Sequence, residues 1–342
     1  MGTSYNDRME AFIRGLPKAE LHLHLEGTLE PELAFELARK HGLQLPYRSI
    51  EEMRRSYEFT DLQSFLDVYM AATAVLRDED DFHALTAAYL RRAHEQGIVH
   101  VEVFFDPQSH TSRGVAFATV LQGIRRALLE AQEQSGITHR LILCFLRHLT
   151  ADEALQTLLD ALPYKSAIAA VGLDSTELGH PPQKYAAVFE RARREGLLAV
   201  AHAGEEGPAA NVRDALDILH VQRIDHGVRC EEDDALVARL ARERIPLTMC
   251  PLSNVRLRVF DRMSDHNVRR LLQRGLCITI NSDDPAYFGG YLNENYLAIH
   301  QELGMGEREL AQLARNSFEA SFLPPHQKQR WLDAVDAYME HR

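Results

Sequence analysis

Short apolar runs alternate with longer amphipathic segments along most of the chain. Between the apolar runs, hydrophobic residues recur at three- and four-residue spacing and glycines often follow, which is typical of helices. Eight alternating units with mostly apolar strands predict an α/β fold, namely a TIM-type (β/α)₈ barrel whose parallel strands are covered by helices. The predicted strands are 20–25, 99–105, 140–146, 168–173, 197–202, 223–227, 245–250 and 276–281.

Two regions depart from this strict alternation. Residues 28–97 are too long for one crossover and contain several helical patterns, the first of which begins near Pro31 and ends at Gly42. Because extra helices after a barrel strand lie over the catalytic mouth, we expect part of 28–80 to form a lid. Residues 291–342 predict helices packed outside the barrel. Since no low-complexity linker or internal repeat interrupts the sequence, residues 1–342 are predicted to form a single domain.

Composition narrows the class of partner. The chain of 342 residues carries a formal net charge of −12, which argues against a nucleic-acid backbone or an anionic membrane as its partner. No apolar run is long enough to span a membrane, and the N-terminus lacks the apolar core of a secretory signal. The cysteines are far apart and form no CxxC motif, so we expect reduced thiols in a cytoplasmic protein. They are Cys144, Cys230, Cys250 and Cys277.

Polar residues gather where the predicted strands end, and in a barrel these ends share one rim. In the stretch ELHLHLEG the alternation places His22 and His24 on one face of the first strand. The fifth, sixth and eighth strands end in AHAGEEG, IDHG and INSDDP. A single histidine at a strand end is more often a hydrogen-bonded loop residue, and an Asp-Asp pair is more often a turn or helix cap. The coincidence of these groups on one rim favours a shared site.

Three imidazoles and one carboxylate suit a divalent ion. We expect His22, His24, His202 and Asp283 to hold one zinc ion, with iron or cobalt as alternatives. Such an ion lowers the pKa of a bound water to about 7, which gives hydroxide near neutral pH. The fourth strand carries no lysine that would bridge a second metal, so we expect one ion in each chain.

Three neighbouring residues are candidates for the reaction, two for acid–base catalysis and one for substrate binding. Glu205, three residues beyond His202, would act as general acid if the barrel mouth desolvates it. His226 would take the proton of the attacking water or stabilise hydroxide, and Asp284 would share a hydrogen bond with substrate. The structural alternatives are a helix N-terminal carboxylate for Glu205 and a helix cap ahead of Pro285 for Asp284.

Five motifs, in order from about residue 15 to residue 320, resemble those of the adenosine/adenine deaminase family of metal-dependent (β/α)₈ hydrolases. They are ELHLHLEGTL, AHAGEEG, RIDHGVRC, CPLSNVRL and INSDDP. The resemblance implies hydrolytic removal of the purine 6-amino group and one zinc on the four residues above. It also implies that Glu205 protonates N1, that His226 orients and deprotonates the water, and that Asp284 contacts N7. The backbone amide of Gly179 would meet N3. The signature of the unrelated cytidine deaminases, H-x-E with P-C-x-x-C, is absent.

Two features resemble the adenine deaminase branch, namely Glu26 where adenosine deaminases carry Asp, and the loop LDSTELGHPPQKY after the fourth strand. The implied reaction converts adenine to hypoxanthine and ammonia in purine salvage. Our hypothesis is that Glu26 and residues 177–182 fill the space of a ribose, so that the free base fits and the nucleoside clashes.

Three alternatives to an adenine deaminase remain open at this point. The chain would be an adenosine deaminase, a deaminase of other 6-substituted purines, or a non-catalytic purine- or metal-binding protein. The non-catalytic alternative would be expected to have lost Glu205 or His226, and both are present. The expected partner of a deaminase is a small purine, namely adenine in the favoured interpretation, and the sequence predicts no oligomeric state.

Overall fold

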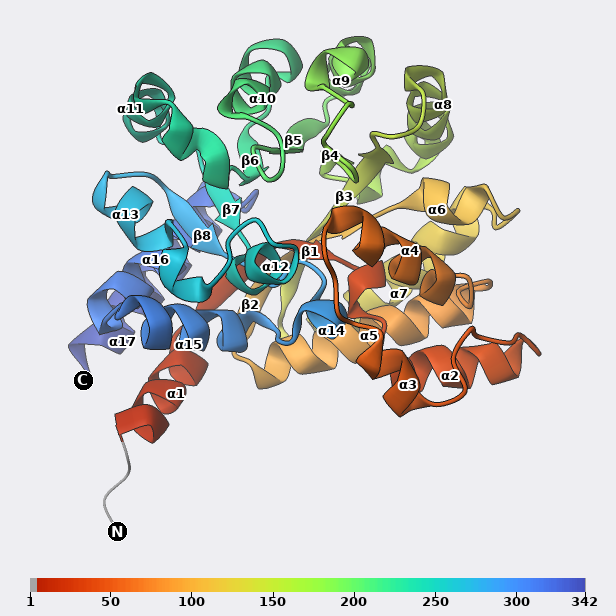
Figure 1. Cartoon of the computed structure of the whole chain (residues 1–342), viewed down its shortest axis with the longest axis horizontal. Helices are drawn as coiled ribbons and strands as arrows, with labels where there is room; N and C mark the ends of the chain where they lie inside the picture. Colours follow the sequence, from red (N-terminus) through yellow and green to blue (C-terminus); the bar gives the residue numbers. More distant parts are fainter. Residues whose placement is uncertain (1–4, 342) are drawn as a thin grey trace.

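Eight parallel strands pair in the order in which they follow along the chain, β1-β2-β3-β4-β5-β6-β7-β8. The computed structural model describes residues 5–341; residues 1–4 and 342, which the single-domain prediction includes, lie outside the described part (Figure 1). The predicted strands are all confirmed, with boundaries that differ by at most two residues. They are β1 (Lys18–His24), β2 (Ile98–Phe105), β3 (Thr138–Leu146), β4 (Ala170–Asp174), β5 (Leu198–Ala203), β6 (Arg223–His226), β7 (Leu247–Met249) and β8 (Ile278–Ile280).

The sheet closes between β8 and β1 through a short contact rather than a long ladder. Leu23 forms an isolated parallel bridge with Asp283. The His24 backbone N–H donates to the Asp283 carbonyl (3.0 Å), and the Asp283 N–H donates to the His22 carbonyl (3.2 Å). The side chain of Asn281 accepts from the Leu21 N–H (2.8 Å) in place of a backbone partner. The closure therefore fixes Asp283 directly beside the two histidines of β1.

Helices surround the strands, as expected for a TIM-type barrel (Figure 1). Each connection between consecutive strands from β3 to β7 contains one α-helix. The connections from β1 to β2, from β2 to β3 and from β7 to β8 contain two or more. The helices are α1 (Tyr5–Gly15), α2 (Pro31–Lys40), α3 (Ile50–Arg55), α4 (Leu62–Thr73), α5 (Glu79–Glu95), α6 (Pro107–Thr111), α7 (Phe117–Ser135), α8 (Ala151–Ala161), α9 (Ala186–Arg194), α10 (Ala209–Asp214), α11 (Asp234–Glu243), α12 (Pro251–Arg256), α13 (Val268–Gln273), α14 (Pro285–Phe288), α15 (Leu292–Leu303), α16 (Glu307–Ala320) and α17 (Pro325–Glu340).

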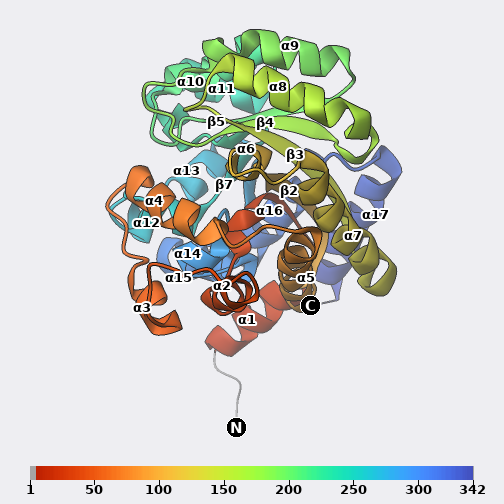
Figure 2. The same ribbon diagram turned by 90° about the vertical axis from the view of Figure 1, so that its right-hand side faces the viewer.

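The additional helices after β1 include the expected cover of the barrel mouth. Helix α4 begins at an N-cap aspartate, Asp61, whose carboxylate accepts from the Ser64 N–H. It turns Phe65 and Tyr69 toward the cavity at the mouth. Figure 2 shows α4 and α12 together at one end of the barrel, with α17 toward the other. Helix α16 packs against β8 and β1, so the C-terminal helices lie outside the barrel, as predicted.

The hydrophobic core has two parts. The larger part lies between the strands and the surrounding helices. A small cluster, formed by Phe104, Ile142, Cys144, Ala170 and Val200, comes from neighbouring strands β2 to β5. Phe104 packs against the His22 and His24 rings, with ring centroids 5.0 Å apart in each case. This cluster thus supports the polar residues at the mouth from below.

Two further expectations concern cysteines and membranes. All four cysteines are buried and unpaired in the structure. Across residues 5–341 no helix combines the length and the apolar character needed to cross a bilayer.

Candidate active site

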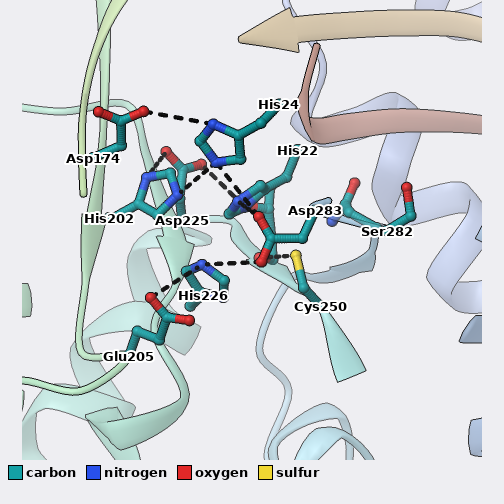
Figure 3. A network of polar contacts seen from close by, with 12 residues as sticks. His22, His24, Asp174, His202, Glu205, Asp225, His226, Cys250, Ser282 and Asp283 are labelled. Atoms are coloured by element: carbon teal, nitrogen blue, oxygen red, sulfur yellow. Dashed lines mark hydrogen bonds and ion pairs between the residues drawn. The ribbon is translucent and has the colours of Figure 1, made fainter. Parts of the chain in front are cut away.

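Four side chains from three distant parts of the chain converge at the carboxyl ends of the strands (Figure 3). The His22 Nε2 lies 3.1 Å from Asp283 Oδ1, and His24 Nε2 lies 3.4 Å from the same oxygen. The Nε2 atoms of His24 and His202 are 3.1 Å apart. The four residues predicted as metal ligands therefore share one centre, and their side chains are almost completely buried.

A fourth histidine, His226, lies at the same centre. His226 joins His22, His202 and Asp283 in a group whose ligand atoms all lie within 4.8 Å of one another. Its Nε2 is 3.8 Å from Asp283 Oδ2 and 3.5 Å from Glu205 Oε2. The geometry thus brings together every residue predicted for metal binding and both residues predicted for acid–base catalysis.

Hydrogen bonds behind His22 determine which of its nitrogens faces the centre. The Thr248 hydroxyl donates to Asp225 Oδ1 (2.9 Å), so its oxygen is left to accept from His22 Nδ1 (2.9 Å). His22 then carries its proton on Nδ1 and turns the Nε2 lone pair toward Asp283. The other Asp225 oxygen lies 3.5 Å from His202 Nδ1. Carboxylates in this position orient histidine ligands in metal sites.

A second hydrogen-bond chain assigns the opposite tautomer to His226. The Val268 N–H donates to His266 Nδ1 (3.2 Å), so His266 Nε2 donates to the Asn254 side-chain oxygen (3.2 Å). The Asn254 amide nitrogen then donates to His226 Nδ1 (3.3 Å). Neutral His226 therefore carries its proton on Nε2 and offers a donor to the centre, whereas a metal ligand offers a lone pair.

The backbone is strained at two of these residues. His226 and Asp283 have φ values of +62° and +65°, in the left-handed region that residues with a side chain rarely adopt. The Glu20 carboxylate fixes the segment before Asp283 by accepting from the Ser282 N–H (3.1 Å) and hydroxyl (2.5 Å). Such strain persists only where neighbouring contacts impose it, and it is common at functional sites.

Glu205 is positioned by a carboxylate from the neighbouring loop. Glu177, in the loop after β4, accepts hydrogen bonds from the backbone N–H groups of residues 204–207 at 2.8–3.1 Å. The Asn211 side chain adds a fifth donor at 2.8 Å. This single buried group therefore fixes the whole AHAGEEG turn. Glu205 itself keeps one oxygen, Oε1, without a hydrogen-bond partner.

Asp284 is held beside the turn that follows β1. A Cβ built on Gly27 would lie 2.0 Å from Asp284 Oδ1, so only glycine allows this close approach. Asp284 is 5% exposed, and its Oδ1 has no hydrogen-bond partner. Asp284 therefore lines the cavity and keeps one unpaired carboxyl oxygen, which lies against Gly27.

Burial sets the protonation of these groups. It lowers the pKa of His24 to about 4 and that of His226 to about 3, so both imidazoles are neutral at pH 7. Burial also raises the pKa of Glu205, and the nearby Asp283 raises it further. The pKa of Asp284 rises for the same two reasons. Burial thus favours the neutral forms of His24 and His226 and the protonated forms of Glu205 and Asp284.

A cavity of about 280 Å³ opens onto this centre. Its wall includes His24, His202, Glu205, His226, Asp283 and Asp284, together with Leu62, Phe65 and Tyr69 of α4. This volume is near the lower end of the range for small-molecule sites. It suits a compact ring system.

Two predicted substrate contacts do not line this cavity. Glu26 is buried behind the wall, where its Oε1 accepts from the Asp106 N–H (3.2 Å) and from His110 Nε2 (2.8 Å). Gly179 has φ +79° in the loop after β4, next to the wall residue His180. The expectation that Glu26 fills space in the pocket is therefore corrected: its carboxylate holds the segment after β2.

Sequence reasoning missed several residues that shape the site. Glu177 stands in the quoted loop LDSTELGHPPQKY, but a carboxylate that binds the backbone of another loop has no local sequence pattern. Asn254 and His266 likewise act through contacts between distant segments. Asp106 and Asp174 both line the cavity, and each follows or ends a strand, which is the one signal that would have identified them.

Comparisons with known proteins agree with this geometry. The family model described as adenosine deaminase matches residues 17–338. An adenine deaminase of Hahella chejuensis is 57% identical over 333 residues, which are 97% of this chain and 100% of that protein. The crystal structure of adenine deaminase from Arthrobacter aurescens superposes with a TM-score of 0.94 at 51% identity and covers 95% of this chain and 99% of that one. The structure of an amidohydrolase from Burkholderia ambifaria, solved with bound zinc, superposes with a TM-score of 0.91 at 26% identity. The match covers 100% of this chain and 96% of that one.

Proposed function

Because the chain belongs to the adenosine deaminase family, we propose that it hydrolyses adenine to hypoxanthine and ammonia. The observation that carries the choice of substrate is the similarity to adenine deaminases over nearly the whole chain. The reaction consumes one water: its oxygen becomes bonded to C6 of the purine, and the 6-amino group leaves as ammonia. The chain must therefore hold the ring, orient a water and deliver a proton.

The residues at the centre fit a zinc ion. His22 Nε2 is buried, has no hydrogen-bond partner and carries a lone pair toward Asp283. Three imidazoles and a carboxylate are ligands that zinc prefers, and iron or cobalt would suit the same set. We propose that His22, His24, His202 and Asp283 hold one ion. When bound, such an ion makes a coordinated water acidic enough to supply hydroxide near neutral pH.

His226 has a different role in this proposal. Its proton lies on Nε2, between Asp283 and Glu205, so it orients the attacking water by hydrogen bonding rather than by binding the metal. Metal content separates the two roles: His24→Ala should lose the ion, whereas His226→Ala should keep it and lose turnover. If His226→Ala lost the ion and His24→Ala kept it, His226 would be the metal ligand and His24 the residue that orients the water.

Glu205 and Asp284 bind and activate the ring. Glu205 keeps a proton in its buried position and donates it to ring nitrogen N1, which makes C6 more electrophilic. Asp284, buried beside Asp283, donates in the same way to N7. Both assignments are supported by the position of the two residues in the cavity wall and by one carboxyl oxygen of each that has no hydrogen-bond partner. Gly179 and Glu26 support the ring only through the loops that carry them.

The proposal extends to the setting of the reaction. The family match over residues 17–338 supports a single domain over residues 1–342. The partner is a free purine, and the acidic surface does not favour nucleic acid. Four buried thiols that form no disulfide support a cytoplasmic location. The proposed reaction, which converts adenine to hypoxanthine, would serve purine salvage.

A purine panel tests the function. Ultraviolet absorbance and ammonia release are measured with adenine, adenosine, adenylate and N6-methyladenine, using metal-replete and chelated protein. The proposal predicts turnover of adenine that is lost on chelation and restored by zinc. A higher kcat/KM for adenosine than for adenine would overturn the substrate assignment, and full activity after verified metal removal would overturn the zinc assignment.

A further inference from the structure

Two acidic residues line the cavity but have no role in the reaction described above. Asp106 directly follows β2 and Asp174 ends β4; they are 3% and 2% exposed. One oxygen of each lies within 4.8 Å of the other and of a His24 nitrogen. Both also line the cavity, so they form one acidic pair in its wall.

Each of these two residues, which line the cavity, has one carboxyl oxygen without a hydrogen-bond partner. Asp106 Oδ1 and Asp174 Oδ1 are buried and accept no hydrogen bond. The contact from the Tyr69 hydroxyl to Asp106 Oδ2 is long, at 3.4 Å. Because unpaired buried acceptors are costly, native proteins rarely keep them without a function. A ligand in the cavity that carries an N–H would satisfy Asp106.

The position of Asp106 is fixed from behind. Its backbone N–H donates to Glu26 Oε1, which also accepts from His110. Arg113 donates to His110 Nδ1 (2.7 Å) and to the carbonyl of Ser109 (3.0 Å). The side chain is thus presented by a rigid, hydrogen-bonded segment, which is what specific recognition requires.

The order of strands indicates which edge of the purine meets Asp106. In the proposed function N1 faces Glu205, which follows β5, and N7 faces Asp284, which follows β8. The opposite edge of the ring then faces the β2–β4 side of the rim. In free adenine this edge carries N3, an acceptor, and the imidazole N9–H, a donor. In a nucleoside N9 is bonded to the sugar and has no proton.

We propose that Asp106 is a specificity-determining residue that accepts a hydrogen bond from N9–H of the free base. This inference rests on the proposed function and assigns its selectivity for a base over a nucleoside. A 9-substituted purine leaves Asp106 unpaired against the substituent, and sites built to bind an N–H reject analogues that lack it strongly. Glu26 acts on specificity through Asp106 and not by filling space.

The test compares adenine with 9-methyladenine, which lacks only the N9 proton and adds a small group. Asp106→Leu keeps a similar shape but has no acceptor, Asp106→Ala also adds room, and Ser109→Ala is a matched control on the same wall. We expect the wild type to prefer adenine in kcat/KM by about 10²-fold or more. In Asp106→Leu the value for adenine should fall about 10- to 100-fold while that for 9-methyladenine changes by less than about 3-fold.

Two results would overturn the inference. One is an undiminished preference for adenine in Asp106→Leu; the other is collapse of the preference in Asp106→Ala alone, which would show exclusion by size. Calorimetric binding of hypoxanthine and 9-methylhypoxanthine gives an independent readout of the same contact. If the wild type releases no ammonia from adenine, the proposed function fails, and the binding ratio in Asp106→Leu still decides the role of Asp106.

Discussion

Two clusters of buried charged residues lie inside this barrel, and they differ in how fully their polar atoms are paired. In the basal cluster, His100, Glu102 and Arg223, Glu102 accepts from Arg223 Nη1 (2.6 Å) and from His100 Nε2 (3.2 Å). The Phe322 backbone N–H also donates to Glu102. Arg223 Nη2 donates to the Leu21 carbonyl (3.0 Å).

The rim cluster is His22, His24, His202, Glu205, His226, Asp283 and Asp284. It also contains histidine and glutamate, with aspartates in place of the arginine, and it is nearly as buried. Unpaired atoms there include His22 Nε2, Glu205 Oε1 and Asp284 Oδ1. Burial and charge therefore do not separate a structural cluster from a functional one. The rim cluster differs in that most of its side chains line a cavity and several keep unpaired atoms that a ligand can pair. In the basal cluster one nitrogen, Arg223 Nε, lacks a hydrogen bond, and it lies 3.7 Å from Asp225 Oδ1.

The comparison is tested most strongly at Glu205. Glu205→Gln removes the proton donor but keeps the shape of the side chain. The value of kcat/KM should fall by about 10² to 10⁴, the usual contribution of general acid catalysis. Elemental analysis should still find the metal. Turnover near that of the wild type would remove Glu205 from its role.

A smaller loss is expected at Glu177, which holds the turn that carries Glu205. A glutamine there would place an amide NH₂ against backbone N–H donors, and charged hydrogen bonds of this kind contribute about 1.5–3 kcal/mol. Glu177→Gln should lower kcat about 10- to 100-fold with little change in KM or metal content. Asn211→Ala, which removes one of the five donors, serves as the graded control. If KM rises and kcat is unchanged, Glu177 shapes the cavity and does not position Glu205.

Substitutions in the basal cluster should change turnover least, because they lower the free energy of unfolding without altering the cavity. Glu102→Gln removes the nearer charge partner of the buried Arg223 and leaves Asp225, whose Oδ1 is 3.7 Å from Arg223 Nε. Breaking a buried ion pair typically costs about 3–5 kcal/mol in the free energy of unfolding. Denaturant titration measures this loss. Turnover per folded, metal-loaded molecule should stay within about 3-fold of the wild type. A loss of about 10²-fold would show that the two clusters are functionally coupled.

The pH dependence of stability sharpens the same contrast. Burial alone would raise the pKa of Glu102, but Arg223 and His100 lower it to about 2. A depressed pKa stabilises the fold above the unfolded value and loses this effect as pH falls toward 2. The stability difference between wild type and Glu102→Gln should be constant above about pH 5 and narrow below it. A difference that widens on acidification would contradict the ion pair.

The sequence predicted the eight strands and the rim because both follow from periodicity and strand ends. Strand ends identified His202, His226 and Asp283 without knowledge of any contact. Closure of the barrel through Asn281 was not predictable, since it replaces a backbone partner with a side chain. The pairs that link distant loops, such as Glu177 with the turn at Glu205, depend on loop paths that leave no periodic signal.

The tautomers of the two key histidines could not be predicted for a related reason. Thr248 sets the proton of His22 and Asn254 sets that of His226, and both act across strands through single hydrogen bonds. The position of Glu26 behind the cavity wall was not predictable either, because it depends on contacts with a distant segment. A longer side chain in the motif suggested a change in the pocket, whereas its carboxylate turns toward the segment behind Asp106.

The metal content of purified protein tests the central claim most directly, namely that the unpaired atoms of the rim cluster hold one divalent ion. Elemental analysis is made on the wild type, on His202→Ala and on Glu102→Gln as the basal control, each checked for folding. We expect about one ion per chain in the wild type and in Glu102→Gln, and almost none in His202→Ala. A folded His202→Ala protein that retains a full ion, or a fully active wild type without one, would contradict the account.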